Sequence, residues 1–543
     1  MDRDALLDDV LRHLAEGTPQ VARAACLAAA AGGGGGGGGG AAYGLAALAD
    51  FWLGDFAGAT RHASYGLGEA ADDPTRAMCS AAAALAAGGD LAAPPVDLAG
   101  LRDLLAAADT PGSRWWSAVR YVAAEAALVG ARIRDAAEVD ALGPPAGESW
   151  TGHPFAPVLW ICQARIAAFS GRIEAADALL APMRASVVAG SRVAPVVESV
   201  AVLVRGNAGD EEVVRVAEAI AAQVPAEPRD FIDRGALLLL SYGAIALYDV
   251  ATAAALAFRA GSDEALSHCT LIDRAISFEM FLHAALLEQD RGAVAAWLAA
   301  LADLAAHPIT EPTVQRARAR VAIEAGDAVT AIDLLTASIE RCVADERRVE
   351  AGEGQILLAR ARILAADLGT ASRGLRTLVA ESDRTGFGAL RRAAGVALAG
   401  SGRRLPPVAG AGWAALSARE AEVARAVLAG QEVEEIAASL FLSPRTVRTH
   451  LSRVLCAFGV ATRVGLLAAV GDDLPSQAPP GAPTLSPRQA EVAALVAAGR
   501  TNPQIAGELG ISVKGVEKHV GDVLLRWNAG SRFELARIWW SLA

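Results

Sequence analysis

The chain has 543 residues, of which 53% are hydrophobic, and its net charge at pH 7 is −12. A chain of this length is too long for one hydrophobic core, so three or four domains are predicted. The charge is uneven: residues 413–543 carry 13 Lys and Arg against 12 Asp and Glu, and the rest carries 36 against 49. The acidic part would be repelled by DNA, whereas the last part can bind DNA if its basic residues share one face.

Six widely spaced cysteines, with no CxxC pair and no His at zinc spacing, indicate buried thiols in a reducing compartment. The uncharged run 24–49 contains nine consecutive glycines, Gly32–Gly40, which makes a membrane helix unfavourable. The hydrophobic run 235–248 ends at Asp249 after about 14 residues, too short to span a bilayer. The first residues are charged and amphipathic rather than a secretory signal. We therefore expect a cytoplasmic protein without a membrane segment.

Abundant alanine and few aromatic residues predict an all-α protein. The glycine run is followed by Ala41 rather than by Lys and Ser or Thr, so it indicates a flexible connection between two helices and not a phosphate-binding loop. Elsewhere in residues 1–400, a glycine recurs at the end of a helical segment with an alanine five residues later. These pairs are Gly54 with Ala59, Gly171 with Ala176, and Gly326 with Ala331.

A glycine in the left-handed conformation ends a helix, and a small alanine lets the next helix pack closely. Such hairpins resemble tetratricopeptide-type repeats, although the spacing is irregular. We predict an irregular α-solenoid of helical hairpins whose concave surface could bind a protein or a small-molecule ligand. Trp115, Trp116 and Trp160 either line a pocket or fill helix interfaces. No catalytic or metal-ligand constellation stands out, so no enzyme activity is expected.

A Pro/Gly-rich segment, 401–412, is predicted to be a linker. Two segments that align with a constant offset of 69 residues follow it, predicted as domains 413–470 and 485–543 and joined by a second linker, 471–484. The first opens "LSAREAEVARAVLAG" and the second "LSPRQAEVAALVAAG", each with a serine placed to cap an amphipathic helix and a glycine to end it.

In both domains a short second helix, 434–440 or 503–509, precedes a brief turn and a third helix. Asn502 followed by Pro503 predicts a cap and first turn for one of them. The third helices carry apolar stripes at helical spacing. These are Val447, Leu451, Val454, Leu455 and Phe458 in the first and Val516, Val520, Val523, Leu524 and Trp527 in the second. A basic, hydrogen-bonding face opposite the stripe, best formed in the first domain, predicts a helix-turn-helix that enters a DNA major groove.

Both domains resemble the four-helix C-terminal DNA-binding domain of LuxR-type bacterial transcription factors. "EIAASLFLSPRTVRTHL" and "FGVATR" carry the likeness in the first domain, and "AAGRTNPQIAGELGIS" and "VEKHV" in the second. The resemblance implies a transcriptional regulator that binds double-stranded DNA as a homodimer or within one chain, and RNA polymerase if it activates. Large relatives also carry a P-loop ATPase. No Walker A motif is present here, so neither ATP hydrolysis nor a cofactor is expected.

The resemblance also implies the DNA-binding residues. In the first domain these are base readers Arg448, Thr449 and Ser452, with Arg445, Thr446, His450 and Arg453 at or near phosphates. In the second they are Thr501, Asn502, Lys514, Glu517, Lys518 and His519. A structural role for the two histidines remains an alternative.

Both domains depart from the family pattern. Glu432 and Glu434 weaken phosphate contact in the first, and Glu517 and Asp522 lie on the reading face of the second. The first domain is therefore expected to be the stronger base reader. Within this linker, the 13 residues 471–483 could extend to about 45 Å, enough for one chain to reach two half-sites about 34–36 Å apart. The alternative is a protein-interaction scaffold whose helix-turn-helix domains no longer bind DNA.

Overall fold

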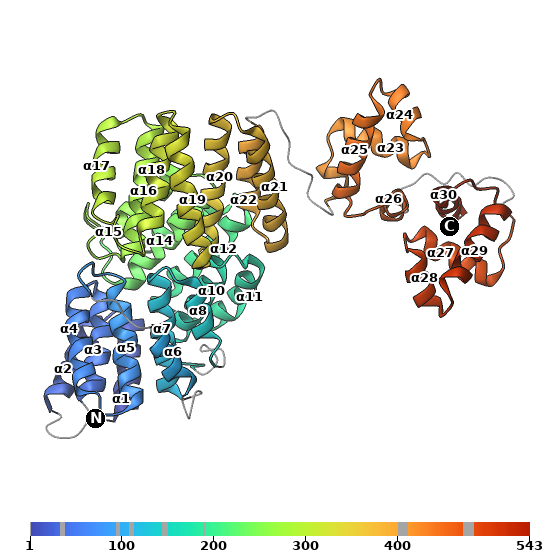
Figure 1. Ribbon diagram of the computed structural model, residues 1–543. Helices are drawn as coiled ribbons and strands as arrows, with labels where there is room; N and C mark the ends of the chain where they lie inside the picture. Colours follow the sequence, from blue (N-terminus) through green and yellow to red (C-terminus); the bar gives the residue numbers. More distant parts are fainter. Residues whose placement is uncertain are drawn as a thin grey trace. The chain divides into compact units, whose positions relative to one another are not determined.

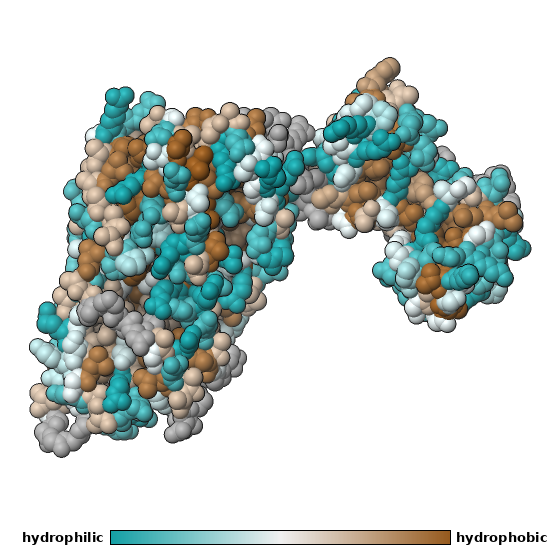
Figure 2. Space-filling view, in the orientation of Figure 1, coloured by the Kyte–Doolittle hydropathy of each residue, from teal (hydrophilic) through white to brown (hydrophobic). Residues whose placement is uncertain are grey.

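The computed structural model describes residues 2–32, 39–93, 98–107, 113–143, 150–188, 190–399, 411–470 and 483–542. No strand occurs in these ranges, which confirms the predicted all-α class. Contacts divide the chain into unit 1, residues 1–404, and unit 2, residues 405–543. Hydrophilic residues interspersed with small hydrophobic areas cover the visible surface of each unit, as amphipathic helices with one buried face require (Figure 2).

Unit 1 consists of helices joined mostly by short turns (Figure 1). They are α1 (Arg3–Ala15), α2 (Pro19–Gly32), α3 (Gly39–Leu53), α4 (Phe56–Glu69), α5 (Asp73–Ala87), α6 (Leu98–Ala106), α7 (Arg114–Val129), α8 (Ile133–Asp140), α10 (Ala156–Phe169), α11 (Ile173–Ala185) and α12 (Ala194–Ala208). The remainder are α13 (Val213–Ala221), α14 (Phe231–Ala246), α15 (Val250–Gly261), α16 (Leu271–Leu287), α17 (Arg291–Ala302), α18 (Glu311–Glu324), α19 (Ala328–Ala344), α20 (Arg348–Leu364), α21 (Leu368–Thr385) and α22 (Gly388–Ala399).

Consecutive helices of unit 1 pack as hairpins, and the predicted turns are confirmed. Gly54, Gly171 and Gly326 have φ angles of 79°, 78° and 80°, in the left-handed region that favours glycine. The alanines five residues later are fully buried. Helices distant in sequence also touch, namely α3 with α14, α7 with α16, and α12 with α22. These contacts go beyond the neighbour-to-neighbour packing of an open solenoid, and the tetratricopeptide-like character of the hairpins stays a prediction.

Other predictions for unit 1 can be placed on this fold. Segment 235–248 overlaps the largely buried helix α14, and no helix in the described ranges is long and apolar enough to cross a membrane. The six cysteines are thiols, five of them buried. Gly32 ends α2 and Gly39 begins α3, while 33–38 lie outside the described residues, as do 401–410 and 471–482 of the linkers. No cluster of His, Cys, Asp or Glu in the described ranges could hold a metal.

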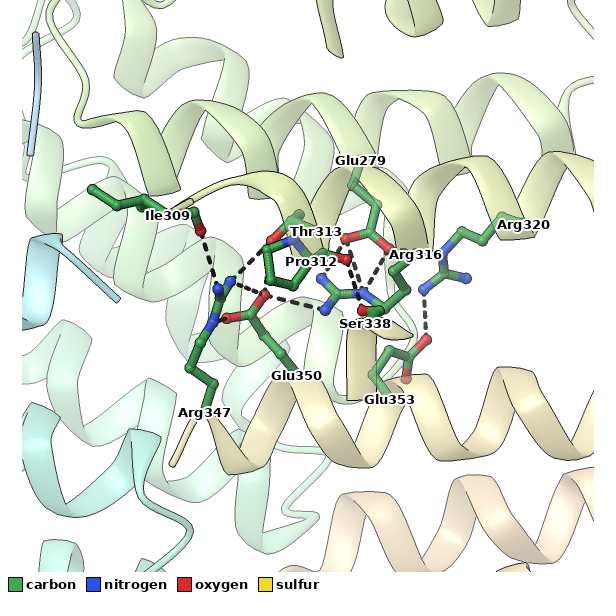
Figure 3. Close-up of polar contacts among 10 residues, drawn as sticks. All are labelled: Glu279, Ile309, Pro312, Thr313, Arg316, Arg320, Ser338, Arg347, Glu350 and Glu353. Carbon is green, nitrogen blue, oxygen red and sulfur yellow. Dashed lines mark hydrogen bonds and ion pairs between the residues drawn. The ribbon is translucent and has the colours of Figure 1, made fainter. Parts of the chain in front are cut away.

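A network of buried ion pairs joins α16, α18 and α20 (Figure 3). Arg316 donates from Nε to Glu279 at 2.9 Å and from Nη1 to Glu350 at 3.1 Å. Arg320 donates from Nε to Glu279 at 3.1 Å, and Arg347 from Nε to Glu350 at 2.6 Å. Each buried charge therefore has an opposite charge in contact, the condition under which charges are tolerated in a protein interior.

This network predicts a pH dependence of stability. Burial alone would raise the pKa of Glu350, but Arg347 and Arg316 lower it from 4.5 to about 2. A carboxyl whose pKa is lower in the folded state stabilises the fold above its unfolded pKa, and this contribution is lost as the pH falls through the folded value. The free energy of unfolding of unit 1 should therefore decline by about 2 kcal/mol from this group between pH 6 and pH 3.

Urea unfolding of Glu350→Gln beside the parent chain at each pH checks this expectation. The variant should be less stable at pH 6, and the difference should shrink as the pH falls. Glu381→Gln is the matched control, because Glu381 is half-exposed and its one ion pair within the described residues is with Arg384. A stability difference for Glu350→Gln that stays constant from pH 6 to pH 3 would contradict the prediction.

In the described residues of unit 2, eight helices form two sets of four, in agreement with the predicted fold class. The first set follows the 3₁₀ turn η1 (Gly412–Ala415) and comprises α23 (Ala418–Leu428), α24 (Val433–Ser439), α25 (Pro444–Ala457) and α26 (Arg463–Val470). The second comprises α27 (Pro487–Ala497), α28 (Asn502–Leu509), α29 (Val513–Arg526) and α30 (Arg532–Leu542). Each set has its own hydrophobic core.

Candidate nucleic-acid interface

The third helix of each domain is held by its apolar stripe. Val447, Leu451 and Val454 of α25 are buried, with Leu455 and Phe458 packed beside them. The equivalent residues of α29 do the same in the second core. Serine caps start both helices: the hydroxyl of Ser443 accepts from the amide of Thr446 at 3.1 Å, and Ser512 accepts from Gly515 at 3.1 Å. The opposite face of each helix is left to solvent.

The turn before the third helix is tight in both domains. It passes through the left-handed region at Phe441 (φ 55°) in the first domain and at Gly510 (φ 63°) in the second. The cap of α28 differs from the prediction by one residue. Thr501 is the N-cap, forming a reciprocal box with Gln504, and Asn502 is the first residue of the helix. The helix starts earlier because threonine with a Gln three residues later satisfies two amides at once.

The predicted DNA-binding residues lie on two surfaces, one on each domain. Those classed as exposed are Arg445, Arg448, Thr449, Ser452, Thr501, Lys514, Glu517 and Lys518. Those partly buried are Thr446, His450, Arg453, Asn502 and His519. The structure therefore gathers the first set along α25 and the second along α29 and the start of α28, as a reading helix in a major groove requires.

An acidic residue engages the central arginine of the first surface. Arg448 on α25 donates from Nη2 to Glu434 Oε1 on α24 at 2.9 Å, and both side chains are more than 60% exposed. Similarly, Arg463 Nη1 lies 3.0 Å from Glu432. The two glutamates that depart from the family pattern thus neutralise two arginines of the same domain. An exposed pair of this kind is weak and can be exchanged for a contact with DNA.

Arg453 has a different environment, which sequence reasoning did not foresee. Its Nε donates to the carboxylate of Glu420, a buried residue that also accepts from the amide of Ser417 at 2.9 Å. Burial would raise the pKa of Glu420, but its hydrogen bonds with Ser417 and Arg453 lower it. The contact links α23 to α25 and orients the reading helix. Its residues are 33 positions apart, so no local pattern could have indicated it.

The basic residues of the second surface differ from those of the first in their ion pairs. Lys514 and Lys518 of α29 form no ion pair with any residue in the described ranges. Asn502 accepts from Arg532 Nη1 at 2.7 Å, which ties the start of α28 to α30. His450 and His519 occupy matching positions, and Nδ1 of each is buried without a hydrogen-bond partner among the described residues. Both their structural and their phosphate-binding roles therefore remain predictions.

The last helices of the two domains touch each other. α26 contacts α27 and α30, and Ala536 of α30 belongs to the core cluster of the first domain. Arg537 on α30 donates to the carbonyl of Ala429, next to the turn glycine Gly430. A Cβ at Gly499, the equivalent turn glycine, would lie 3.3 Å from Cα of Gly465 on α26. Each last helix therefore packs against the same turn of the other domain.

Two helices joined by a tight turn, the second with a buried stripe and an exposed polar face, define each domain as a helix-turn-helix module. Residues 414–469 and 483–539 match the family described as bacterial regulatory proteins, luxR family. The chain thus carries two LuxR-family domains at its C-terminal end.

Curated relatives agree with this assignment. HTH-type transcriptional regulators of Mycobacterium bovis and Mycobacterium tuberculosis are 44% identical to this chain over 68 residues, which cover 12% of this chain and 8% of each relative. The transcriptional regulatory protein NarL of Mycobacterium tuberculosis is 43% identical over 53 residues, 10% of this chain and 24% of that protein. The similarity thus spans less than a tenth of the first relatives' length. It supports a DNA-binding regulator and does not favour the scaffold alternative.

Proposed function

We propose that this chain is a sequence-specific DNA-binding regulator of transcription. The observation that carries the proposal is the exposed face of α25, where Arg445, Arg448, Thr449 and Ser452 lie opposite a buried apolar stripe. Arginine recognises the O6 and N7 atoms of guanine in the major groove, and neighbouring cations take the phosphates. Unit 1 would control this activity in the cytoplasm without an enzymatic step, and RNA polymerase would be a further partner of an activator.

We further propose that one chain supplies both readers of a two-part DNA site. LuxR-type dimers pair their last helices, and α26 and α30 are the last helices of the two domains. Their contact through Ala536 and Arg537 supports an intramolecular version of this pairing. The two reading faces differ in sequence, so the preferred site would be asymmetric. A footprint that covers one half-site per chain would contradict this arrangement.

Enrichment of DNA fragments tests the proposed function. The purified full-length chain would be mixed with sheared genomic DNA, and the bound fragments sequenced beside those bound by Arg448→Ala. Sharp peaks that disappear in the variant are the expected result. Absence of enrichment at low salt, both for the full chain and for residues 405–543, would overturn the proposal. Enrichment by the shorter piece alone would mean that unit 1 holds the full chain inactive.

The pairing of Arg448 with Glu434 leads to a prediction of increased affinity. Glu434→Gln removes the competing charge and one source of repulsion from phosphates, so affinity for DNA should rise about three- to ten-fold at low salt. Titration of a labelled site by fluorescence anisotropy at several salt concentrations measures this. Glu422→Gln, which removes the paired acid of Arg419 on α23 outside the reading surface, is the control and should change affinity much less. Equal affinities of the parent chain and Glu434→Gln would refute the competition.

A further inference from the structure

A cavity of about 210 Å³ lies inside unit 1, and all the residues that line it belong to this unit. Residues from α3 to α22 line it, and most of its wall is apolar, with Phe51, Leu128, Ile272 and Leu390 from different helices. The three tryptophans for which the sequence left a pocket role open do not lie on this wall. Trp115 instead donates to the carbonyl of Pro74 in a helix interface. The cavity therefore arises from the closure of the helical array and not from a local aromatic motif.

Helix α14 presents one face to the cavity. Phe231, Arg234, Gly235, Leu238 and Tyr242 all lie on the wall, at the spacing of one side of a helix. A Cβ built on Gly235 would meet no heavy atom within 4 Å, so the wall is open beside Arg234. A methyl group at this position would therefore meet no neighbour, and a longer side chain would start from open space on the cavity wall.

Most arginines on the wall are compensated. Figure 3 shows Arg316, Arg320 and Arg347 in contact with glutamates of the buried network. On the other side, Arg165 Nη1 lies 2.6 Å from Glu125. These charges are committed to the fold and do not require a ligand.

Arg234 is the exception among them. Its side chain is only 6% exposed, it lines the cavity, and within the described ranges it has no ion pair and no hydrogen bond, with Nε fully buried. The acids near its end of α14 are engaged elsewhere, since Asp230 and Asp233 both pair with Arg192. Burial lowers the pKa of Arg234, and the neighbouring acids offset this only in part. The guanidinium nevertheless stays charged at neutral pH.

The other polar groups of the wall limit what the ligand can be. Asp273 is the acid on the wall that lacks a contacting arginine, and its two oxygens accept from Tyr242 and Thr270 at 2.6 Å each. Burial and the nearby Arg320 lower the pKa of His283 to about 4, so this imidazole is neutral. The wall carries five arginines and five acids, and Asp273 is satisfied by its two hydroxyl donors. Arg234 is the one of these charged groups that has neither an ion pair nor a hydrogen bond within the described residues, so the wall can accept one negative group beside it.

We propose that this cavity binds a small organic monoanion, an apolar body with one carboxylate, and that Arg234 is the group that recognises the carboxylate. A buried charge without a partner is unfavourable, and a carboxylate accepts two parallel hydrogen bonds from one guanidinium. A phosphate ester would bring a second negative charge that the wall does not match. The inference concerns unit 1 and does not depend on the proposed DNA binding.

Ligand binding to the full-length chain tests the inference. Octanoate, octan-1-ol, octylamine and octyl phosphate would be compared by isothermal titration and by the shift of the unfolding temperature. Octanoate is expected to bind at least ten-fold more tightly than the alcohol, the amine and the phosphate. Equal binding of octanoate and octan-1-ol, tighter binding of the amine or the phosphate, or no binding of octanoate would each overturn the proposal.

Variants separate recognition from folding. Arg234→Met should weaken octanoate binding at least ten-fold and leave the unfolding temperature without ligand unchanged or higher, because it removes an uncompensated buried charge. Gly235→Leu should fill the cavity and abolish octanoate binding, while the circular dichroism spectrum of a helical protein is retained. Arg274→Met is the matched control, since Arg274 is partly buried and its Nε has no hydrogen-bond partner among the described residues, but it does not line the cavity. Undiminished octanoate binding by Arg234→Met would refute the assignment even if Gly235→Leu failed to fold.

Discussion

Replacement of Arg448 with alanine is expected to weaken binding to a specific DNA site by roughly ten- to hundred-fold, about 1–3 kcal/mol. Arg448 lies at the centre of the exposed face of α25, and its partner in the free protein, Glu434, is itself exposed. On DNA the guanidinium can exchange this weak pair for two hydrogen bonds to a guanine. Removing it loses the base contact and leaves Glu434 facing the phosphates.

The decisive measurement is the ratio of specific to non-specific affinity for the parent chain and Arg448→Ala at the same salt. Arg445→Ala is the matched comparison, because a phosphate contact should weaken both kinds of site equally and reduce the salt slope by about one. Adding Glu434→Gln to each single variant completes a double-mutant cycle that isolates the pair. An unchanged ratio in Arg448→Ala would mean that this residue does not read sequence.

The second large effect is expected in unit 1. Glu279→Leu should lower the free energy of unfolding by roughly 3–5 kcal/mol, because removing one member of a buried ion-pair network leaves the remaining buried charges incompletely compensated. Glu279 is 4% exposed and accepts hydrogen bonds from both Arg316 and Arg320. One substitution therefore removes one of the two counter-ions of each guanidinium group and leaves Arg316 with Glu350 and Arg320 with Glu353. The pKa of Arg316, which burial would lower, is held well above its ordinary value by Glu279 and Glu350.

Because the chain has two units, its unfolding need not be a single transition. Hydrogen exchange read by mass spectrometry in urea assigns the loss of protection to α16, α18 and α20 separately from unit 2. Glu381→Ala provides the control: its pair with Arg384 at 2.7 Å is exposed and should contribute less than about 1 kcal/mol. Similar small losses for both variants would show that the buried network contributes little to stability.

Patterns within one helix were readable from the sequence. The stripe of Val447, Leu451 and Val454, the serine caps and the left-handed glycines follow from the period of the helix and the chemistry of its ends, and the structure confirms them. Interactions between helices could not be predicted from the sequence. Arg453 meets Glu420 only because α23 and α25 cross at that point, and the cavity wall combines residues as distant as Phe51 and Leu390.

The same distinction explains what was missed around the reading surfaces. The sequence predicted that Glu434 weakens phosphate contact, which stays a prediction. It did not indicate the contact of Glu434 with Arg448, because that contact depends on the angle between two helices. Arg234 showed no signal at all, because an arginine without a counter-ion is recognised only when every neighbour is known. The constant offset between the two domains, which places Gly430 and Gly499 at equivalent turns, predicted an internal repeat. It did not predict the contact of α26 with α30.

The contact between α26 and α30 has a consequence for how such a protein can change over time. In a homodimer, each substitution in a reading helix is copied into both halves of the complex, so any shift in preference must suit two half-sites simultaneously. Here α25 and α29 are encoded separately in one gene, and Arg448 has its counterpart in Glu517. On the two-part site proposed above, a mutation in one helix would alter one half of the recognised DNA and leave the other half to anchor the chain. The preferred DNA sequence could thus change in one half-site at a time, with partial binding preserved after each change.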